Sequence, residues 1–418
     1  MNEKLFQFIW QQLRFNQRNL ETVAGEKILI LYQGSLNTNQ GPDFLNARIR
    51  INETTWAGNV ELHLRETDWE RHKHQQDSNY DNVILHVVLK ADGNAIDRNI
   101  PTLSLGDRIS HTILNKHEML LATGEELPCR SLLSGVNEDD FLNCNERMLV
   151  EKWNAKCLQI FESLKECGNH YEEVLWRLTA GNFGITVNTE SFVAIARSLP
   201  WKVVQQVRHI PHALESLLLG QGGLLNSSFR EKYPLMLKKE YNFICRKYKL
   251  EKPQVALHFL RMRPANFPTI RLVQLADLFC RQSHLFAAIR DADSMHNLLA
   301  LLNAEAVDYW QYHYRLDEEC AFSEKKLGQE MRSNILINTF LPFLYAYGRH
   351  VQSVDYMNKA LDWLRLLPAE NNRVTRQFCD AGFVMNNAFD SQAIVYLKKH
   401  YCNEKKCLQC SIGTKVLL

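Results

Sequence analysis

The chain has 418 residues, of which 45% are apolar and 23% charged, and its formal net charge at pH 7 is +2. This balance is typical of a folded protein and excludes a disordered one. No apolar run approaches the roughly 18 residues that span a bilayer, and the N-terminus has no apolar core of a secretory signal. We therefore expect a cytoplasmic protein with no membrane partner. The length allows two or three domains.

Residues 1–130 predict an α/β domain with its elements in the order helix, strand, strand, strand, helix, strand. Each β-like run is bounded by Gly, Asn or Asp, as strands usually are, and the first helix has apolar residues at a spacing of four. The helices are expected at 3–15 and 67–75, and the strands at 27–34, 47–51, 54–64 and 82–90, with a candidate further strand at 100–105.

From about residue 138 the pattern becomes helical, so we assign residues 131–418 to a large, mostly α-helical region. Apolar spacings of three and four recur in the segments 137–164, 212–220, 230–248 and 269–280. Neither a fixed repeat nor a low-complexity linker is evident. The fold class is therefore α+β: an N-terminal α/β domain followed by the helical region.

Asp43 and Glu61 are the first candidate functional residues. Gly41 and Pro42 make a turn, so Asp43 enters the following strand at its first position. Glu61 and His63 are two residues apart and project from one face of the next strand. If these strands pair as a hairpin, Asp43 comes within reach of Glu61. Two carboxylates and a neighbouring carbonyl suit Mg²⁺, which activates water and stabilises charge on a phosphodiester; the alternative is ordinary surface chemistry.

The placement of these acids resembles the PD-(D/E)XK nuclease superfamily over roughly residues 3–90. The resemblance implies a core of helix, three strands, helix and strand, and a nuclease site in which Asp43 and Glu61 match the two acids. His63 stands where the motif has lysine, and histidine does not supply a constant cation. Whether catalysis survives this departure stays open. Lys73, in the following helix, is a candidate substitute from a displaced position.

Other phrases resemble an uncharacterised bacterial family known only as a domain of unknown function. They are "GPDFLNARI", "WAGNVELH", "YDNVILHVV", "RPANFPTIRL" and the tail "YCNEKKCLQCSIG". This similarity would extend over essentially the whole chain. It implies no established activity.

Several further polar and aromatic residues of the N-terminal domain have two interpretations. His72, His74 and Asp81 either line the same pocket as the acids or face solvent from a helix and a loop. His86 lies inside an apolar run, where a hydrogen-bonded core histidine is the commoner outcome. Trp56 and Trp69 are expected to pack rather than to stack on bases.

A basic and aromatic window lies at residues 226–275, with 11 Lys and Arg against 3 Glu. Interleaved cations and aromatics suit the backbone and bases of a nucleic acid. The candidate nucleic-acid-binding residues are Lys238, Lys239, Arg246, Lys247, Arg261 and Arg263. The alternative is an amphipathic helix with aromatics in the core and lysines in water.

Eleven cysteines, an odd number that is mostly scattered singly, indicate reduced thiols rather than a disulfide scaffold. Three of them, Cys402, Cys407 and Cys410, form a C-x4-C-x2-C cluster whose intervening lysines favour thiolates. Zinc or an iron–sulfur cluster would need a fourth ligand, for which Cys379 is nearest in sequence and His400 would serve zinc. The alternative is three reduced thiols in a Lys-rich terminus.

Together these patterns favour a Mg²⁺-dependent nucleic-acid phosphodiesterase, or a catalytically inactive descendant that still binds DNA or RNA. Asp43 and Glu61 would hold the metal, and His63 would orient water or phosphate. The alternative, of a different class, is a non-enzymatic interaction protein whose helical region docks a protein partner.

Overall fold

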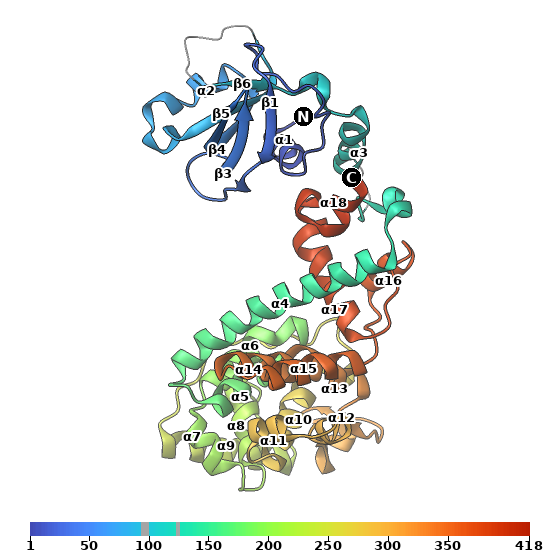
Figure 1. Ribbon diagram of the computed structural model, residues 1–418. Helices are drawn as coiled ribbons and strands as arrows, with labels where there is room; N and C mark the ends of the chain where they lie inside the picture. The colour runs from blue at the N-terminus through green and yellow to red at the C-terminus, as the bar shows by residue number, and fades with distance from the viewer. Residues whose placement is uncertain (93–99, 123–125) are drawn as a thin grey trace. The chain divides into compact units, whose positions relative to one another are not determined.

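A computed structural model describes residues 1–92, 100–122 and 126–418 (Figure 1). The chain divides into two compact units. Unit 1 contains residues 1–146, 376–383 and 394–418, and unit 2 contains residues 147–375 and 384–393. The C-terminal cysteines therefore belong to the unit that holds the sheet. Among the described residues, no helix is both long and apolar enough to cross a membrane.

A mixed six-stranded sheet forms the centre of unit 1. Its strand order is β1-β3-β4-β5-β6, and β2 pairs with β3. The pairs β1/β3 and β3/β4 are antiparallel, whereas β4/β5 and β5/β6 are parallel. The bounds are β1 Ile28–Tyr32, β2 Ser35–Leu36, β3 Phe44–Ile51, β4 Thr54–Arg65, β5 Val83–Lys90 and β6 Thr102–Ser104. The mixed α+β class and all the expected strands are confirmed.

The hairpin between β3 and β4 sets the register of the sheet. Its turn follows Ile51, which pairs with Thr54, and Asn52 takes the left-handed conformation (φ 50°) that Asn tolerates better than most residues. Further along, Phe44 pairs with Val60. This register brings the beginning of β3 beside the second half of β4.

Close packing of β4 against β5 depends on a glycine. A Cβ at Gly58 would lie 2.4 Å from Ile84 Cγ2 and 2.6 Å from the Asn82 carbonyl oxygen. Strand β5 is buried along most of its length, as expected for a strand with neighbours on both sides and covered faces. The polar residues of β4 at this point are therefore buried too.

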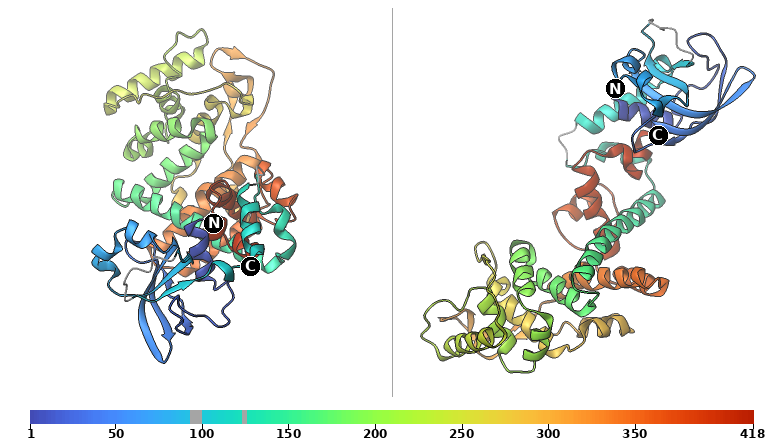
Figure 2. Two further views of the ribbon diagram at one scale, coloured as in Figure 1. Left: turned by 90° about the horizontal axis from the view of Figure 1, so that it is seen from above. Right: turned by 90° about the vertical axis from the view of Figure 1, so that its left-hand side faces the viewer.

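Two helices next to the sheet position the polar residues. Helix α1 (Glu3–Gln11) begins at Asn2, whose side chain caps the Leu5 N–H, and it buries one apolar face. It contacts β4, and both ribbon views show it along the curled sheet (Figures 1 and 2). Helix α2 is shorter than expected, Asp68–Arg71, and also contacts β4. Left-handed Lys73 (φ 59°) separates it from the 3₁₀ turn η1 (His74–Gln76).

The C-terminal part of unit 1 packs against the segment that follows the sheet. Helix α18 (Ser411–Leu417) contacts α3 (His111–Ala122) and the 3₁₀ helix η4 (Arg130–Gly135). The ribbon views show α18, in red, beside α3, in teal (Figures 1 and 2). The neighbouring elements are α16 Arg373–Cys379, α17 Ala388–Leu397, the π-helix η8 Lys398–Cys402 and the 3₁₀ helix η9 Cys407–Gln409.

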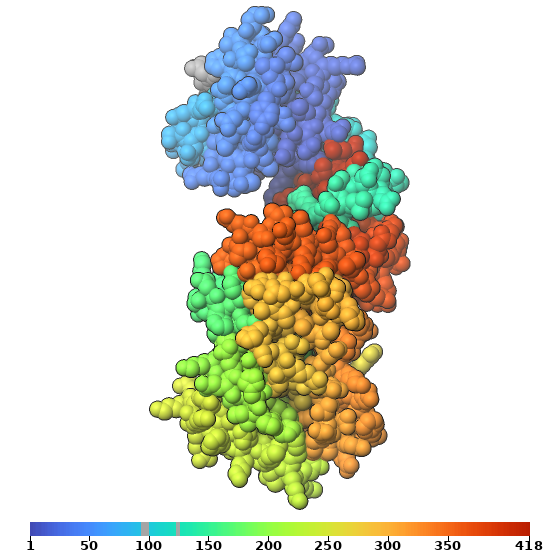
Figure 3. All heavy atoms as spheres, turned by 60° about the horizontal axis from the view of Figure 1, so that its bottom comes forward, coloured from blue at the N-terminus to red at the C-terminus, as the bar shows by residue number. Residues whose placement is uncertain are grey.

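Unit 2 is mainly helical. Segments far apart in the sequence pack together in it: α10 contacts α5 and α8, and α13 contacts α5. The space-filling view shows these green, yellow and orange segments in close contact (Figure 3). Its helices are α5 Tyr171–Phe183, α6 Ile185–Arg197, α7 Trp201–Val207, α8 Ala213–Gln221, α9 Lys232–Tyr248, α10 Pro268–Arg281, α11 Leu285–Asp291, α12 Met295–Ala300, α13 Gln329–Ile335, α14 Leu341–His350 and α15 Val354–Leu366.

Helix α4 (Glu138–Glu166) runs from one unit into the other in sequence. Short strands also occur in unit 2, at Glu305–Ala306 (β7), His313–Arg315 (β8), Glu318–Glu319 (β9) and Lys325–Lys326 (β10). Of the two tryptophans that were expected to pack, Trp69 is buried, whereas Trp56 is 49% exposed. It lies on the first half of β4, which is exposed on both faces.

Candidate metal centre

The two predicted acids lie side by side at the start of β3. Asp43 directly precedes that strand, and its backbone N–H donates to Glu61 Oε2 at 3.0 Å. The Asp43 carboxylate accepts hydrogen bonds from the Leu62 N–H at 3.1 Å and from Gln7 Nε2 of α1 at 2.8 Å. Glu61 is only 5% exposed. The hairpin thus brings both carboxylates to one place, and α1 orients the first of them.

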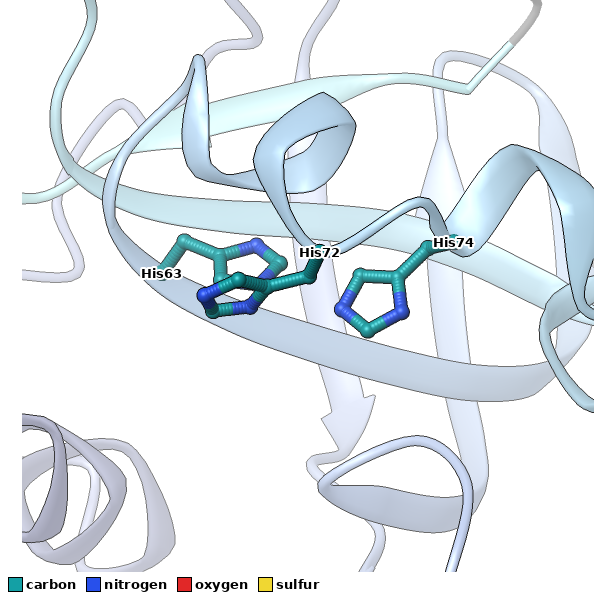
Figure 4. Close-up of side chains that lie close together, drawn as sticks. All are labelled: His63, His72 and His74. Atoms are coloured by element: carbon teal, nitrogen blue, oxygen red, sulfur yellow. The ribbon is translucent and has the colours of Figure 1, made fainter.

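Two histidines lie close to Oε1 of the Glu61 carboxylate, and two more contact the first of them. His63 Nε2 and His74 Nε2 lie 3.5 and 3.4 Å from Glu61 Oε1. His63 Nε2 also lies 3.2 Å from His72 Nδ1, and its Nδ1 is 2.9 Å from His86 Nε2. Figure 4 shows the rings of His63, His72 and His74 gathered between β4 and the segment after α2. We call Asp43, Glu61, His63, His72 and His74 the acid–histidine site.

Burial makes both carboxyl groups hard to ionise in the metal-free chain. It raises the pKa of Asp43 to about 6, although the Leu62 N–H and the Gln7 amide oppose the rise. Burial raises the pKa of Glu61 to about 9, and the negative charge of Asp43 adds to the effect. The raised pKa values mean that ionisation of both carboxyl groups is unfavourable in the metal-free chain. A cation bound between them would favour the ionised form.

Burial has the opposite effect on the imidazoles. It lowers the pKa of His63 to about 2, and the neighbouring His86, His74 and His72 lower it further. The pKa of His74 is also lowered, first by burial and then by His72. Both rings are therefore neutral at neutral pH, which is the form that binds metal ions.

The donor atoms of this site fit a divalent metal ion. One ring nitrogen from each of His63, His72 and His74 lies within 4.8 Å of the others. The buried His74 Nε2 makes no hydrogen bond among the described residues, although Glu61 Oε1 is near. A buried polar atom without a hydrogen bond needs an explanation, and a metal ligand supplies one. Carboxylates suit Mg²⁺ and Mn²⁺, whereas imidazoles favour first-row transition metals.

Two histidines whose interpretation the sequence left open, His72 and His74, are part of this site. Asp81 and Lys73 are both exposed, and no contact of their side chains with the acids is present among the described residues. His86 is 1% exposed and packs against His63, as a core histidine would. Sequence reasoning missed Gln7, because nothing in the pattern of a helix says which of its polar residues faces a strand far along the chain.

The three predicted cysteines of the C-terminal cluster lie in unit 1, and a fourth ligand stays a prediction. Cys407 and Cys410 are buried and Cys402 is half-buried. Cys379 and His400 are both exposed. Two other cysteines, Cys129 and Cys144, are close enough for the cluster to raise the pKa of their thiols, and both are buried.

The predicted nucleic-acid-binding residues spread over two elements of unit 2. Lys238, Lys239, Arg246 and Lys247 lie on α9, and Arg261 and Arg263 lie in the loop before α10. All but Lys238 are exposed. Lys238 Nζ donates to the backbone carbonyls of Asn226 at 3.3 Å and Ser227 at 2.7 Å. Its charge is therefore partly engaged within the chain.

Arg263 also lines a cavity of about 1060 Å³ in unit 2, together with Lys156 and Arg271. Arg271 is 7% exposed, and its guanidinium donates to Gln274 and Asn266, which are neutral. Its Nε has no hydrogen-bond partner among the described residues. Burial lowers the pKa of both Arg271, to about 10, and Lys156. A buried cation without a carboxylate partner suits an anionic ligand.

Comparison with known proteins finds a matching family. The model of a family described as "Protein of unknown function (DUF2851)" matches residues 3–373. No curated protein matches, and no solved structure matches. The expected resemblance to an uncharacterised family is confirmed, while the nuclease resemblance stays a prediction.

Proposed function

Since the chain belongs to the DUF2851 family, for which no activity is described, we propose its function from the acid–histidine site: a divalent-metal-dependent phosphodiester hydrolase that acts on nucleic acid. One observation carries the proposal. Asp43, directly before β3, meets Glu61 on β4. His63 and His74 lie against Glu61 Oε1, and a ring nitrogen of each of His63, His72 and His74 lies within 4.8 Å of the others. Carboxylate oxygens and neutral imidazole nitrogens are both metal ligands. Their clustering is not a usual pattern of surface residues.

Each residue of the site has a distinct role in this proposal. Glu61 and Asp43 hold the cation, and Gln7 keeps the Asp43 carboxylate in place. His74 and His63 supply nitrogen ligands or orient a water molecule, because both are neutral. A bound divalent ion would activate water and stabilise the charge that develops on a phosphodiester. Three imidazoles make Mn²⁺ or a similar transition metal a better occupant than Mg²⁺.

Two features favour a nucleic acid over a small phosphodiester as substrate. Unit 1 has the element order helix, three strands, helix and strand that the nuclease resemblance implies, with β2 as a short addition. Unit 2 presents exposed cations on α9 and a cavity lined by Arg263 and the buried Arg271. Cations that are not neutralised within the chain suit phosphate groups.

A second candidate is a non-enzymatic protein whose helical region docks a protein partner. The observation that favours it is also on α9, where Leu235, Met236 and Phe243 are 47%, 42% and 61% exposed. Exposed apolar residues in one region often mark an interaction surface. Under this alternative the acid–histidine site would have a structural role, and binding of a partner would not depend on a metal.

The test is hydrolysis of end-labelled DNA and RNA, single- and double-stranded, by the full chain with Mn²⁺ or with Mg²⁺. We expect cleavage with Mn²⁺ that exceeds cleavage with Mg²⁺. Asp43→Asn should abolish cleavage, because it removes one anionic ligand but keeps the Gln7 hydrogen bond possible. Asp81→Asn is the matched control, since Asp81 is an exposed acid of the same unit, and it should cleave as the wild type does.

Calorimetric titration with Mn²⁺ separates the two parts of the proposal. Metal binding without cleavage of any substrate, together with retained nucleic-acid binding, would identify an inactive descendant. No Mn²⁺ binding, or equal binding by wild type and Asp43→Asn, would contradict the metal site and favour the interaction protein.

A further inference from the structure

Five of the eleven cysteines meet where the C-terminal residues of unit 1 pack against the segment after the sheet. We call Cys129, Cys144, Cys402, Cys407 and Cys410 the cysteine group. Four of them are buried, and Cys402 is half-buried. The group draws on two stretches of chain, residues 129–144 and 402–410, that are far apart in sequence. None of the acid–histidine residues belongs to it.

The elements that bring these cysteines together are in direct contact. Cys129 is the residue before η4, and Cys410 is the residue before α18, and η4 packs against α18. Cys402 ends η8 and Cys407 begins η9, and these two turns also contact each other. The four residues therefore lie at the ends of elements that meet, where side chains can converge without distorting a helix.

Helix α18 approaches Cys407 so closely that a glycine is required. A Cβ at Gly413 would lie 2.1 Å from the Cys407 carbonyl oxygen and 2.9 Å from its Cα. Lys415 of the same helix forms an ion pair with Asp140 Oδ1 at 3.3 Å, and Lys405 Nζ donates to the Leu121 carbonyl at 2.5 Å. The C-terminal residues around the three cysteines are thus held against Leu121 and Asp140.

The thiols influence one another, which supports their proximity. The thiols of Cys144 and Cys410 are hydrogen-bonded, and this bond and burial raise the pKa of Cys144. Burial raises the pKa of Cys402, and the nearby Cys410, Cys129 and Cys407 raise it further. Burial also raises the pKa of Cys129, to about 12, with contributions from Cys410 and Cys407. Four of the sulfurs therefore share one environment, and Cys144 lies beside Cys410.

We propose that Cys129, Cys402, Cys407 and Cys410 bind one thiolate-ligated metal centre, and that Cys144 donates a hydrogen bond to the sulfur of Cys410. Four thiolates are a complete ligand set both for a structural zinc ion and for an iron–sulfur cluster. Because a metal takes the place of the thiol protons, it would stabilise the thiolates that burial otherwise disfavours. The centre would join the segment after the sheet to the C-terminal residues of unit 1.

The spacing of the sulfurs favours an iron–sulfur cluster over one zinc ion. Around a single zinc ion, four sulfurs lie about 3.8 Å apart, because each Zn–S bond is about 2.3 Å. No three cysteine sulfurs come within 4.8 Å of one another, and all eleven cysteines are among the described residues. A cluster accepts wider spacing, because its ligands bond to different iron atoms.

The test is the metal content of the full chain purified without oxygen. We expect a brown protein with broad absorption near roughly 400 nm and about four iron and four acid-labile sulfide ions per chain. Replacement of any of the four ligands by Ala should remove at least about nine-tenths of the iron. Cys379→Ser is the matched control, since Cys379 is an exposed cysteine of the same unit, and it should keep the wild-type content.

Cys144→Ala distinguishes a ligand from a hydrogen-bond donor. It should keep the iron but shift the reduction potential, because hydrogen bonds to cluster sulfurs tune it. Loss of iron in Cys144→Ala with retention in Cys129→Ala would overturn the ligand assignment. Zinc at one ion per chain would overturn the iron–sulfur cluster.

If the ligand variants fail to fold, the wild type alone decides the proposal. A thiol reagent added to the native chain should leave the four ligands unmodified until the metal is removed. The proposal would be overturned if the purified wild type contained no metal and if a chelator left the reactivity of all five thiols of the group unchanged.

Discussion

The acid–histidine site and the cysteine group lie in the same unit, but the chain builds them in different ways. The acid–histidine site comes from residues 43–74, held by one hairpin and the turns after it. The cysteine group joins residues 129–144 to residues 402–410, so it forms only when distant parts of the chain meet. The first site depends on local register, whereas the second closes a long loop.

This difference predicts opposite relations between function and stability. The acids of the first site repel each other and are poorly solvated, so the fold tolerates them at a cost that a cation removes. The cysteines of the second site hold two chain segments together, so a metal there would add to the stability of the fold. Removal of a ligand should therefore stabilise the metal-free chain in one place and destabilise the holoprotein in the other.

The largest expected effect is the loss of stability in Cys407→Ser. Without the metal centre, the thermal midpoint of unit 1 should fall by on the order of 10 °C, because several kcal/mol of metal-binding free energy are coupled to folding. Differential scanning calorimetry of the anaerobic full chain measures it. Cys379→Ser should change the midpoint by less than about 2 °C. An equal fall in Cys379→Ser and Cys407→Ser would show that the loss does not depend on a metal ligand and would contradict the stabilising role of the cysteine group.

The next effect separates the histidines of the first site. His74→Ala should weaken Mn²⁺ binding by roughly 10- to 100-fold, because its buried Nε2 is near Glu61 Oε1 and has no other partner among the described residues. His72→Ala should weaken it by less than about 10-fold, since His72 is exposed and its ring is less firmly held. Titration calorimetry gives both values, and a larger loss in His72→Ala would reverse the assigned order.

Glu61→Gln should raise the stability of the metal-free chain while it removes Mn²⁺ binding. The pKa of Glu61 rises from 4.5 to about 9 on folding, so between these values the folded chain keeps a proton that the unfolded chain has lost. The free energy of unfolding therefore falls as pH rises through this window. We expect the free energy of unfolding of Glu61→Gln at pH 8 to exceed that of the wild type by about 1–2 kcal/mol.

Denaturant titration at pH 5 and pH 8 with a chelator present measures this effect. The gain should shrink at pH 5, where both states of the wild type are closer to full protonation. Lower stability of Glu61→Gln at pH 8 would show that the carboxyl group supports the fold, as the cysteine group is proposed to do.

The smallest expected effect concerns the cations of α9, which lie outside both regions. Variants of these residues test whether the acid–histidine site has a nucleic-acid substrate. Lys239→Ala should reduce the slope of log affinity against log salt by about 0.9 if its phosphate contact is to duplex DNA. Lys238→Ala should reduce it less, because Lys238 Nζ already donates to two carbonyls. Filter binding over a salt series measures both. Binding that does not depend on salt would leave these lysines as solvent-facing residues.

The sequence by itself determined the main strands of the sheet in unit 1 and the pairing of Asp43 with Glu61. Alternation of apolar residues and the turn at Asn52 specify both the strands and the register, and the register then brings the acids together. The helical character of most of the later chain also followed from apolar spacing. These are local properties, which a reader of the sequence can follow from one residue to the next.

Tertiary structure alone decided which other residues join the two sites. Gln7 reaches Asp43 across 36 positions, and Cys129 meets Cys410 across a much longer stretch, because helices pack by faces and not by sequence distance. The sequence named Cys379 as the nearest further cysteine, but it is exposed, whereas Cys129 is buried where η4 meets α18. Long-range packing is set by the shapes of many buried side chains at once, so no short pattern records it.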